Sequence, residues 1–327
     1  MIRGFRTRRA RWQRQAILVA LGSLAVAGCS ATGAGTTTGS PSASPAPALQ
    51  AVIVSSLSSS GPCGGVACGA VGLNQRIGIF VTTPTGGVVS GATVQAQVFT
   101  VPTSTGGAAT ALGPAQQATY AGGGIESPDQ NINRGVYAIY QTFSAPGQYH
   151  LAVKATKGAD AATSDLSYLV LSADPGIAVG SPAPRSHNQV AADVTDISTI
   201  DTGTPPDDMH YTTIAAAIAA HHVTAIYMGT PAFCQSHTCA PELNAVKTVE
   251  GQYRARGVDF IHIEVYKGGR PDNADFTKAT LSPTFTEWKL DTEPWVMLVD
   301  KNGNLAYKFS GATGGEEISA ALDKLLA

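Results

Sequence analysis

The chain has 327 residues, with 21 Lys+Arg against 23 Asp+Glu and a formal net charge of −2. Six arginines and no acidic residue lie in residues 1–28, so the rest of the chain holds 15 basic against 23 acidic residues, a net charge of −8. Because nucleic-acid binding needs a clustered basic surface, this acidic balance argues against a nucleic-acid partner.

Residues 1–28 have the organisation of an export signal. Their arginine-rich start precedes the apolar stretch AILVALGSLAVAG, which is shorter than the membrane span of about 20 residues and leads into Cys29. VAGC resembles the lipobox of bacterial lipoproteins. The resemblance implies that Cys29 is diacylated and anchors the chain in the lipid bilayer, on the extracytoplasmic face of the cell membrane. The alternative is an ordinary secretory signal followed by a chance cysteine.

Residues 29–50 are the predicted connection between the lipid and the first domain. Beyond Cys29 they consist mainly of Ser, Thr, Gly, Pro and Ala, without charge. Such a segment cannot bury enough surface to offset the entropy of ordering it, so it is predicted to be a flexible linker. The chain beyond it is long enough for two domains.

Residues 51–172 are predicted to form an all-β domain. Period-2 alternation of apolar and polar residues predicts strands with one buried face at 76–83, 93–101, 135–143 and 148–156. Gly/Pro turns separate these segments and helical periodicity is absent, which favours a β-sandwich. GVYAIYQTFSAPGQYHLAV resembles the late hairpin of immunoglobulin-like modules. We expect its aromatic residues to pack the core, and the domain to act as a spacer or a partner-binding module.

The four cysteines beyond Cys29 form two pairs, each with four intervening residues: Cys63 with Cys68, and Cys234 with Cys239. Disulfides persist in exported proteins, and two local bridges leave no odd thiol. For Cys63 and Cys68 we expect a structural disulfide, because a metal clip there lacks histidine or carboxylate partners nearby in the sequence.

Residues 174–327 follow an α/β pattern, after a Pro/Gly-dense boundary at 174–184. The predicted order is a helix at 211–222, a strand at 223–229, the cysteine loop, a helix from about Pro241 to Arg256, a strand at 258–266, a short helix at 285–290, a hairpin of 294–300 with 305–311, and a helix at 315–327. Together with VGSPAP, this order resembles thioredoxin-like proteins of the membrane-anchored and peroxiredoxin-related kinds. The resemblance implies a thioredoxin-like fold for this domain.

The cysteine loop carries the first motif of that resemblance. Cys239 and Pro241 match the first cysteine and the proline of a Cys-Gly-Pro-Cys motif, while the resolving cysteine is replaced by Glu242 and its partner becomes Cys234, upstream. A helix N-terminus stabilises a thiolate, so we expect Cys239 to face solvent and attack, and Cys234 to resolve. A carboxylate at Glu242 is expected to oppose the thiolate, whereas His237 in the loop adds positive charge when protonated.

TEPWVMLVD carries the second motif. It resembles the thioredoxin segment in which a cis-proline lies against the active-site cysteine, and Pro294 is the candidate. The resemblance implies that Glu293, together with Pro294 and Pro241, positions the substrate chain. The alternative is an ordinary trans proline at the start of a strand.

Three functions remain open for the Cys234–Cys239 pair. The first is thiol–disulfide exchange on exported proteins, with their thiols and disulfides or a membrane electron donor as partners. The second is a non-catalytic scaffold with a structural disulfide. The third is a copper chaperone, although the spacing is one residue longer than Cys-x-x-x-Cys and His262 lies within a strand. DISTIDTGTPPDDMH, the cysteine loop, FIHIEVY and EPWVMLVD together resemble exported bacterial proteins that join both domain types. We expect no cofactor and no metal.

Overall fold

The structure is a computed structural model, which describes residues 48–54, 63, 66–102, 107–122, 135–234, 238–271, 280–290, 292–311 and 313–327. The predicted export signal, Cys29 and His237 lie outside the described residues, as does most of the predicted linker. Residues 46–327 form one compact unit. Leu49 is buried and the first strand starts at Gln50, so ordered structure begins slightly before the predicted end of the linker.

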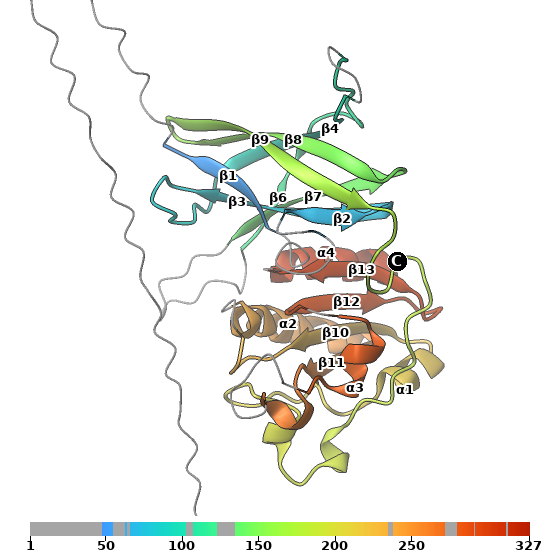
Figure 1. Cartoon of the computed structure of the whole chain (residues 1–327). Helices are drawn as coiled ribbons and strands as arrows, with labels where there is room; N and C mark the ends of the chain where they lie inside the picture. Colours follow the sequence, from blue (N-terminus) through green and yellow to red (C-terminus); the bar gives the residue numbers. More distant parts are fainter. Residues whose placement is uncertain are drawn as a thin grey trace, which may run out of the picture. The chain divides into compact units, whose positions relative to one another are not determined.

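Two sheets enclose the first core. The strands are β1 (Gln50–Val54), β2 (Cys68–Ala70), β3 (Gly72–Thr82), β4 (Thr93–Thr100), β5 (Gln116–Gln117), β6 (Thr119–Ala121), β7 (Val136–Phe143), β8 (Gly147–Lys157) and β9 (Asp160–Leu171). One sheet has the order β1-β3-β7-β6, and the other has the order β2-β9-β8-β4-β5 (Figure 1). All neighbours are antiparallel except β2 and β9. This is the sandwich expected of an immunoglobulin-like fold.

The alternating segments of the sequence became strands because their apolar positions fill the space between the two sheets. In β4, Val94, Ala96 and Val98 are buried, and in β8 so are Leu151 and Val153. The expected packing role of the hairpin aromatics is confirmed for Tyr137, Phe143 and Tyr149, which lie in this core, whereas Tyr140 packs against the core beside α4. β1, β2, β5, β6 and β9 were not among the strands predicted from the sequence.

A third sheet, with the order β11-β10-β12-β13, organises the rest of the chain (Figure 1). Its strands are β10 (Val223–Gly229), β11 (Val258–Glu264), β12 (Trp295–Val299) and β13 (Leu305–Ser310), and the helices are α1 (Ile214–Ala219), α2 (Cys239–Tyr253), α3 (Pro283–Glu287) and α4 (Gly315–Leu326). Short 3-10 helices span Ala191–Asp193, Ile197–Thr199, Arg254–Arg256 and Lys267–Gly269. Only β10 and β11 are parallel, and the chain passes between them through α2. This is the strand and helix order expected of a thioredoxin-like fold.

Each face of this sheet has its own apolar core, because side chains of a strand alternate between the two faces. On one face, Ile226 and Met228 of β10 pack with α1 and α3. On the other face, Ala225 and Tyr227 pack with α2 and α4. The cysteine loop connects β10 to α2, so it opens onto the face that carries α2 and α4.

A buried ion pair links β3 to α4. The guanidinium of Arg76 donates to both carboxylate oxygens of Glu317 at 2.7 and 2.8 Å, and to the carbonyl oxygen of Ser310 at 3.0 Å. Tyr140 of β7 also donates to Glu317. Burial alone would lower the pKa of Arg76, but the charge and hydrogen bonds of Glu317 outweigh it and raise that pKa. Glu242 of α2 is buried beside this cluster.

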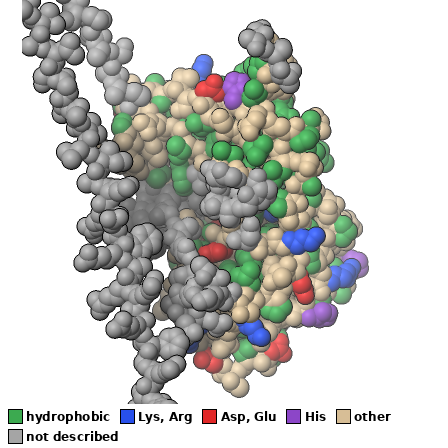
Figure 2. Space-filling view, in the orientation of Figure 1, with side chains coloured by type: hydrophobic (Ala, Val, Ile, Leu, Met, Phe, Trp, Pro, Cys, Tyr) green, Lys and Arg blue, Asp and Glu red, His purple; other side chains and the backbone are tan. Residues whose placement is uncertain are grey.

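Surface features of the described residues are modest. On the face drawn in Figure 2, Lys and Arg side chains lie singly among uncharged ones rather than in a continuous patch. Within the described ranges, no helix combines the length and the apolar character needed to cross a membrane.

Candidate functional site

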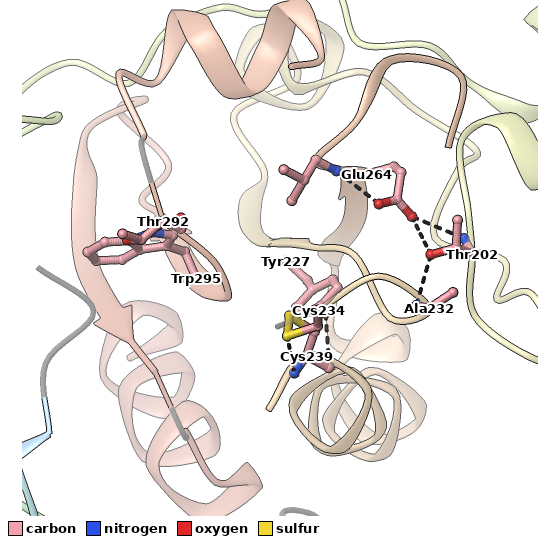
Figure 3. Close-up of a disulfide and its surroundings, with 9 residues drawn as sticks. Thr202, Tyr227, Ala232, Cys234, Cys239, Glu264, Thr292 and Trp295 are labelled. Atoms are coloured by element: carbon pink, nitrogen blue, oxygen red, sulfur yellow. Dashed lines mark hydrogen bonds between the residues drawn. A yellow bond between two sulfur atoms is a disulfide. The ribbon is translucent and has the colours of Figure 1, made fainter. Parts of the chain in front are cut away.

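The Cys234–Cys239 pair is joined by a disulfide between the end of β10 and the first residue of α2 (Figure 3). The two Cα atoms lie 6.0 Å apart. Cys234 is half-buried, whereas Cys239 is fully buried in the core that packs α2 and α4 against the sheet. As whole residues the two cysteines therefore differ in exposure: Cys234 keeps some accessible surface and Cys239 keeps none, although both lie against the same core.

The expectation that Cys239 faces solvent was wrong. Cys239 starts an apolar stripe along α2 that continues through Leu243 and Val246, and residues three or four apart lie on the same side of a helix. Position 239 is therefore turned toward the sheet. The spacing of these three residues in the sequence carried this information, which the comparison with Cys-Gly-Pro-Cys motifs obscured.

The sulfur of Cys234 accepts a hydrogen bond at the start of α2, which is the contact expected for the attacking sulfur. The backbone N–H of Cys239, at the start of α2, donates to the sulfur of Cys234 over 3.3 Å. Helix N-terminal amides and the helix dipole favour the thiolate over the thiol once the bridge is reduced. The burial of Cys239 and this contact favour Cys234 as the attacking cysteine, while the roles of attack and resolution stay predictions.

Glu242, which was expected to oppose the Cys239 thiolate, lies inside the fold. It is fully buried, and burial raises its pKa to about 8, with a further increase from Glu317 and opposing effects of Thr313 and Arg76. Neither carboxyl oxygen accepts a hydrogen bond within the described residues, and the Thr313 hydroxyl donates to the Gly311 carbonyl oxygen at 2.9 Å. Near neutral pH, Glu242 is mostly uncharged and opposes a thiolate only weakly.

The Glu293–Pro294 peptide bond is cis, as the sequence analysis expected. Pro294 is buried, whereas Glu293 is half-buried, and its carboxylate and the two sulfurs of the cysteine pair all lie within 4.8 Å of one another. Burial raises the pKa of Glu293, and the charge of Glu264 raises it further. Glu293 is therefore more exposed than Pro294, and the role of the two residues in positioning a substrate chain stays a prediction.

Pro241 lies inside α2 and is buried. Its ring therefore packs within the fold, and its part in positioning a substrate chain stays a prediction. Trp295, the first residue of β12, is also buried and donates its indole N–H to the Thr292 carbonyl oxygen at 2.7 Å (Figure 3).

A polar relay supports the cysteine loop from the other side (Figure 3). The carboxylate of Glu264 accepts the N–H and the hydroxyl of Thr202 at 3.1 and 2.7 Å. The Thr202 hydroxyl oxygen in turn accepts the N–H of Ala232 at 3.2 Å, two residues before Cys234. Tyr227 donates its hydroxyl to the carbonyl oxygen of Cys239 at 2.9 Å. Both ends of the disulfide loop are thus held by side chains of neighbouring segments.

The structure does not bring a histidine to the cysteine pair among the described residues. The titratable group that joins the two sulfurs is the carboxyl of Glu293, a hard oxygen ligand that suits Cu(I) poorly. His262, weighed for the copper site, packs edge-on against the Tyr227 ring with 4.9 Å between ring centroids, and binds Asp207.

Cys63 and Cys68 form the expected structural disulfide in the sandwich. Both cysteines are buried, and Cys68 belongs to β2. No other cysteine, histidine or carboxylate groups with them in the described part of the chain.

The sequence analysis missed a second buried cluster, formed by Asp201, Asp207, His210 and His262. One ligand-type atom from each residue lies within 4.8 Å of those of the other three. Three of these residues come from the loop between the 3-10 helix Ile197–Thr199 and α1, and His262 comes from β11. No local sequence motif indicates this cluster, because β11 is distant from this loop in the sequence.

No family model matches the chain, and no curated protein matches it. Among solved structures, the chain is similar to a thiol:disulfide interchange protein of the thioredoxin family from Chlorobium tepidum TLS, with 14% identity and a TM-score of 0.29, covering 45% of this chain and 97% of that one. It is also similar to the PKD domain from the human VPS10 domain-containing receptor SorCS2, with 19% identity and a TM-score of 0.17, covering 46% of this chain and 97% of that one.

Proposed function

We propose that this chain performs thiol–disulfide exchange on exported proteins through Cys234 and Cys239. The observation that carries the proposal is the contact between the sulfur of Cys234, the more exposed cysteine of the pair, and the N–H of Cys239 at the start of α2. This contact gives the Cys234 sulfur a neighbour that stabilises its thiolate, and the disulfide shows that the second sulfur lies within bonding distance.

The exchange consists of two displacements. In the reduced protein, the Cys234 thiolate attacks one sulfur of a substrate disulfide, which forms a mixed disulfide and releases the other substrate sulfur as a thiolate. The Cys239 thiolate then attacks the Cys234 sulfur, which forms the internal disulfide and releases the second substrate thiolate. Two electrons pass from the protein dithiol to the substrate disulfide. The same steps in reverse oxidise a substrate dithiol, and a membrane electron donor or an external thiol–disulfide couple resets the pair.

Glu293 is placed to move the proton in these steps. Cys239 must lose its proton before it attacks, although its surroundings are apolar, and apolar burial disfavours the charged form. The Glu293 carboxyl lies within 4.8 Å of both sulfurs, and its raised pKa brings it nearer to that of a thiol. We assign Glu293 the role of general base for Cys239 in the resolving step and of general acid in reverse.

Membrane attachment is the second part of the proposal. The lipobox-like VAGC sequence supports diacylation of Cys29, and the uncharged linker up to about residue 48 supports a tethered, extracytoplasmic position for the folded part. Metabolic labelling with radioactive palmitate should label the wild-type chain and leave Cys29→Ala unlabelled. Absence of label in the wild-type chain, or equal label in the variant, would contradict the lipid anchor at Cys29.

A scaffold with a permanent bridge is the second candidate, and the complete burial of Cys239 favours it. A redox titration of the whole chain separates the two, with alkylation of each cysteine followed by mass spectrometry so that both pairs are measured in one sample. Exchange predicts that Cys234–Cys239 titrates between about −120 and −270 mV, the range of known oxidoreductases. A value below about −300 mV for both pairs would instead support the scaffold.

A further inference from the structure

The buried cluster of Asp201, Asp207, His210 and His262 belongs to neither the disulfide nor its immediate partners. All four side chains are essentially sealed from solvent, with exposed side-chain fractions of 0–2%. Nε2 of His210 and Nδ1 of His262 both face the two carboxylates. We propose that these four residues form a closed binding site for a divalent transition-metal cation, with Zn²⁺ as the best match.

The separations between the atoms fit four ligands around one ion. Nε2 of His210 lies 3.3 Å from an oxygen of Asp201 and 3.5 Å from an oxygen of Asp207. Nδ1 of His262 lies 3.7 and 2.9 Å from the other oxygen of Asp201 and of Asp207, respectively. Zinc–ligand distances of about 2.0–2.2 Å in a tetrahedron correspond to ligand–ligand distances of about 3.3–3.6 Å. One ligand-type atom from each of the four residues already lies within 4.8 Å of the other three, so an ion would draw these atoms together as the two carboxylates turn one oxygen each toward both rings.

The ligand atoms of the cluster also match a cation. The carboxylate oxygens of Asp201 and Asp207 and the inner ring nitrogens of His210 and His262 can all donate electron pairs to one ion, and buried carboxylates are costly unless a positive charge balances them. A divalent ion supplies that charge. The outer ring nitrogens, Nδ1 of His210 and Nε2 of His262, have no hydrogen-bond partner among the described residues.

Backbone amides hold the carboxylates in position, as an outer shell does for metal ligands. The two oxygens of Asp201 accept N–H groups of Gly203 and Asp207, both at 2.7 Å. One oxygen of Asp207 accepts the N–H of Met209 at 2.9 Å, and the N–H of His262 donates to the Met209 carbonyl oxygen at 2.9 Å. The loop is thus folded around its own two carboxylates and fixed to β11.

Ligand chemistry and access favour zinc in a structural role. Two imidazole nitrogens and two carboxylate oxygens are a ligand set that Zn²⁺ accepts readily, and four protein ligands leave no open position for catalysis. Asp207 and His210 also line a surface cleft with Thr195 and Tyr211, so solvent reaches the edge of the cluster although its side chains are sealed. Thr202 of the same loop holds Ala232, so the ion would also stiffen the approach to Cys234.

The test measures zinc binding to the whole chain in its oxidised state. A chelator first removes bound metals, and Zn²⁺ is then added. We expect one zinc per chain to survive gel filtration, and isothermal titration calorimetry to show at least a 100-fold weaker affinity in each of Asp207→Asn and His210→Gln. The matched control is His222→Gln, which removes a half-exposed histidine paired with Asp259 at 2.9 Å and should leave zinc binding unchanged.

Cobalt substitution in the unaltered chain covers the case in which a variant fails to fold. Tetrahedral Co²⁺ with nitrogen and oxygen ligands gives strong visible absorption without the near-ultraviolet thiolate band. Absence of retained zinc in the folded chain, a thiolate band, or unchanged affinity in folded Asp207→Asn and His210→Gln would each overturn the proposal. In that event the cluster is a buried ion-paired network without a metal.

Discussion

The two disulfides of this chain have the same spacing and opposite surroundings. Each closes a loop with a sequence separation of 5 and a Cα–Cα distance of 6.0 Å. Cys63 and Cys68 are both buried in the sandwich, whereas Cys234 is half-buried and accepts an amide at the start of α2. The Glu293 carboxyl joins only the second pair among the described residues. The comparison teaches that the neighbours of a cysteine pair, rather than its spacing, decide whether it is equipped for exchange.

The strongest way to break this comparison is to remove the carboxyl that distinguishes the second pair. Glu293→Gln keeps the shape of the side chain but cannot carry the proton, so we expect exchange with a small disulfide to slow by about 100-fold, at the lower end of general acid–base effects. Stopped-flow kinetics across pH 5–9 should also lose the titration that the wild type shows. Glu287→Gln, on the exposed surface of α3, is the matched control. An unchanged rate and pH profile would leave Glu293 without a chemical role.

Glu242 offers a second test, because its burial in α2 raises the pKa of its carboxyl. It lies beside the ion-paired cluster of Arg76, Tyr140 and Glu317 and near Thr313. Its pKa of about 8 in the folded chain is raised from about 4.5, so its contribution to stability is fully present below pH 4.5 and is lost as pH rises through 8. Each pKa unit corresponds to about 1.4 kcal/mol. Between pH 6 and 8 the free energy of unfolding should fall by roughly 2 kcal/mol more in the wild type than in Glu242→Gln.

Urea unfolding at several pH values measures this difference, with the disulfides kept oxidised. The free energies of wild type and Glu242→Gln should run parallel below pH 4.5 and separate above it. Parallel curves over the whole range would mean that Glu242 titrates normally, and the carboxyl would then carry its charge beside the active pair near neutral pH.

The smallest expected effect concerns the first disulfide. Replacing Cys63 and Cys68 by serine removes a bridge that closes a short loop, which costs about 2 kcal/mol in the chain-entropy description. We expect the midpoint of urea unfolding to fall while exchange at Cys234 keeps its rate, because Cys68 belongs to a strand of the sandwich and Cys234 follows a strand of a different sheet. Loss of exchange in this variant would show that the two pairs do not act independently.

Most of the fold could be predicted from the sequence, because it depends on local patterns. The strand predicted at 223–229 coincides with β10, which is buried along its whole length. The helix expected from Pro241 starts two residues earlier, at Cys239, since the first turn of a helix tolerates proline. β9 was missed because its solvent-facing positions are rich in Ser, Thr and Asp.

The site was predicted only in part, because it is assembled by tertiary contacts. The pairing of Cys234 with Cys239 and the cis bond before Pro294 are confirmed. The burial of Cys239 depends on which side of α2 meets the sheet, and the cluster around His262 depends on a loop folding back onto β11. Sequence motifs indicate neither the side of α2 that meets the sheet nor the folding of this loop onto β11.

Trapping of the mixed disulfide tests the central claim most directly. Reduced Cys239→Ser and Cys234→Ser variants of the whole chain are mixed with a disulfide-bonded peptide and analysed by mass spectrometry. Attack by Cys234 predicts that Cys239→Ser accumulates one peptide linked at Cys234 within seconds to minutes, whereas Cys234→Ser reacts at least about 100-fold more slowly. Faster adduct formation at Cys239, or no adduct at either cysteine in the folded variants, would contradict the account.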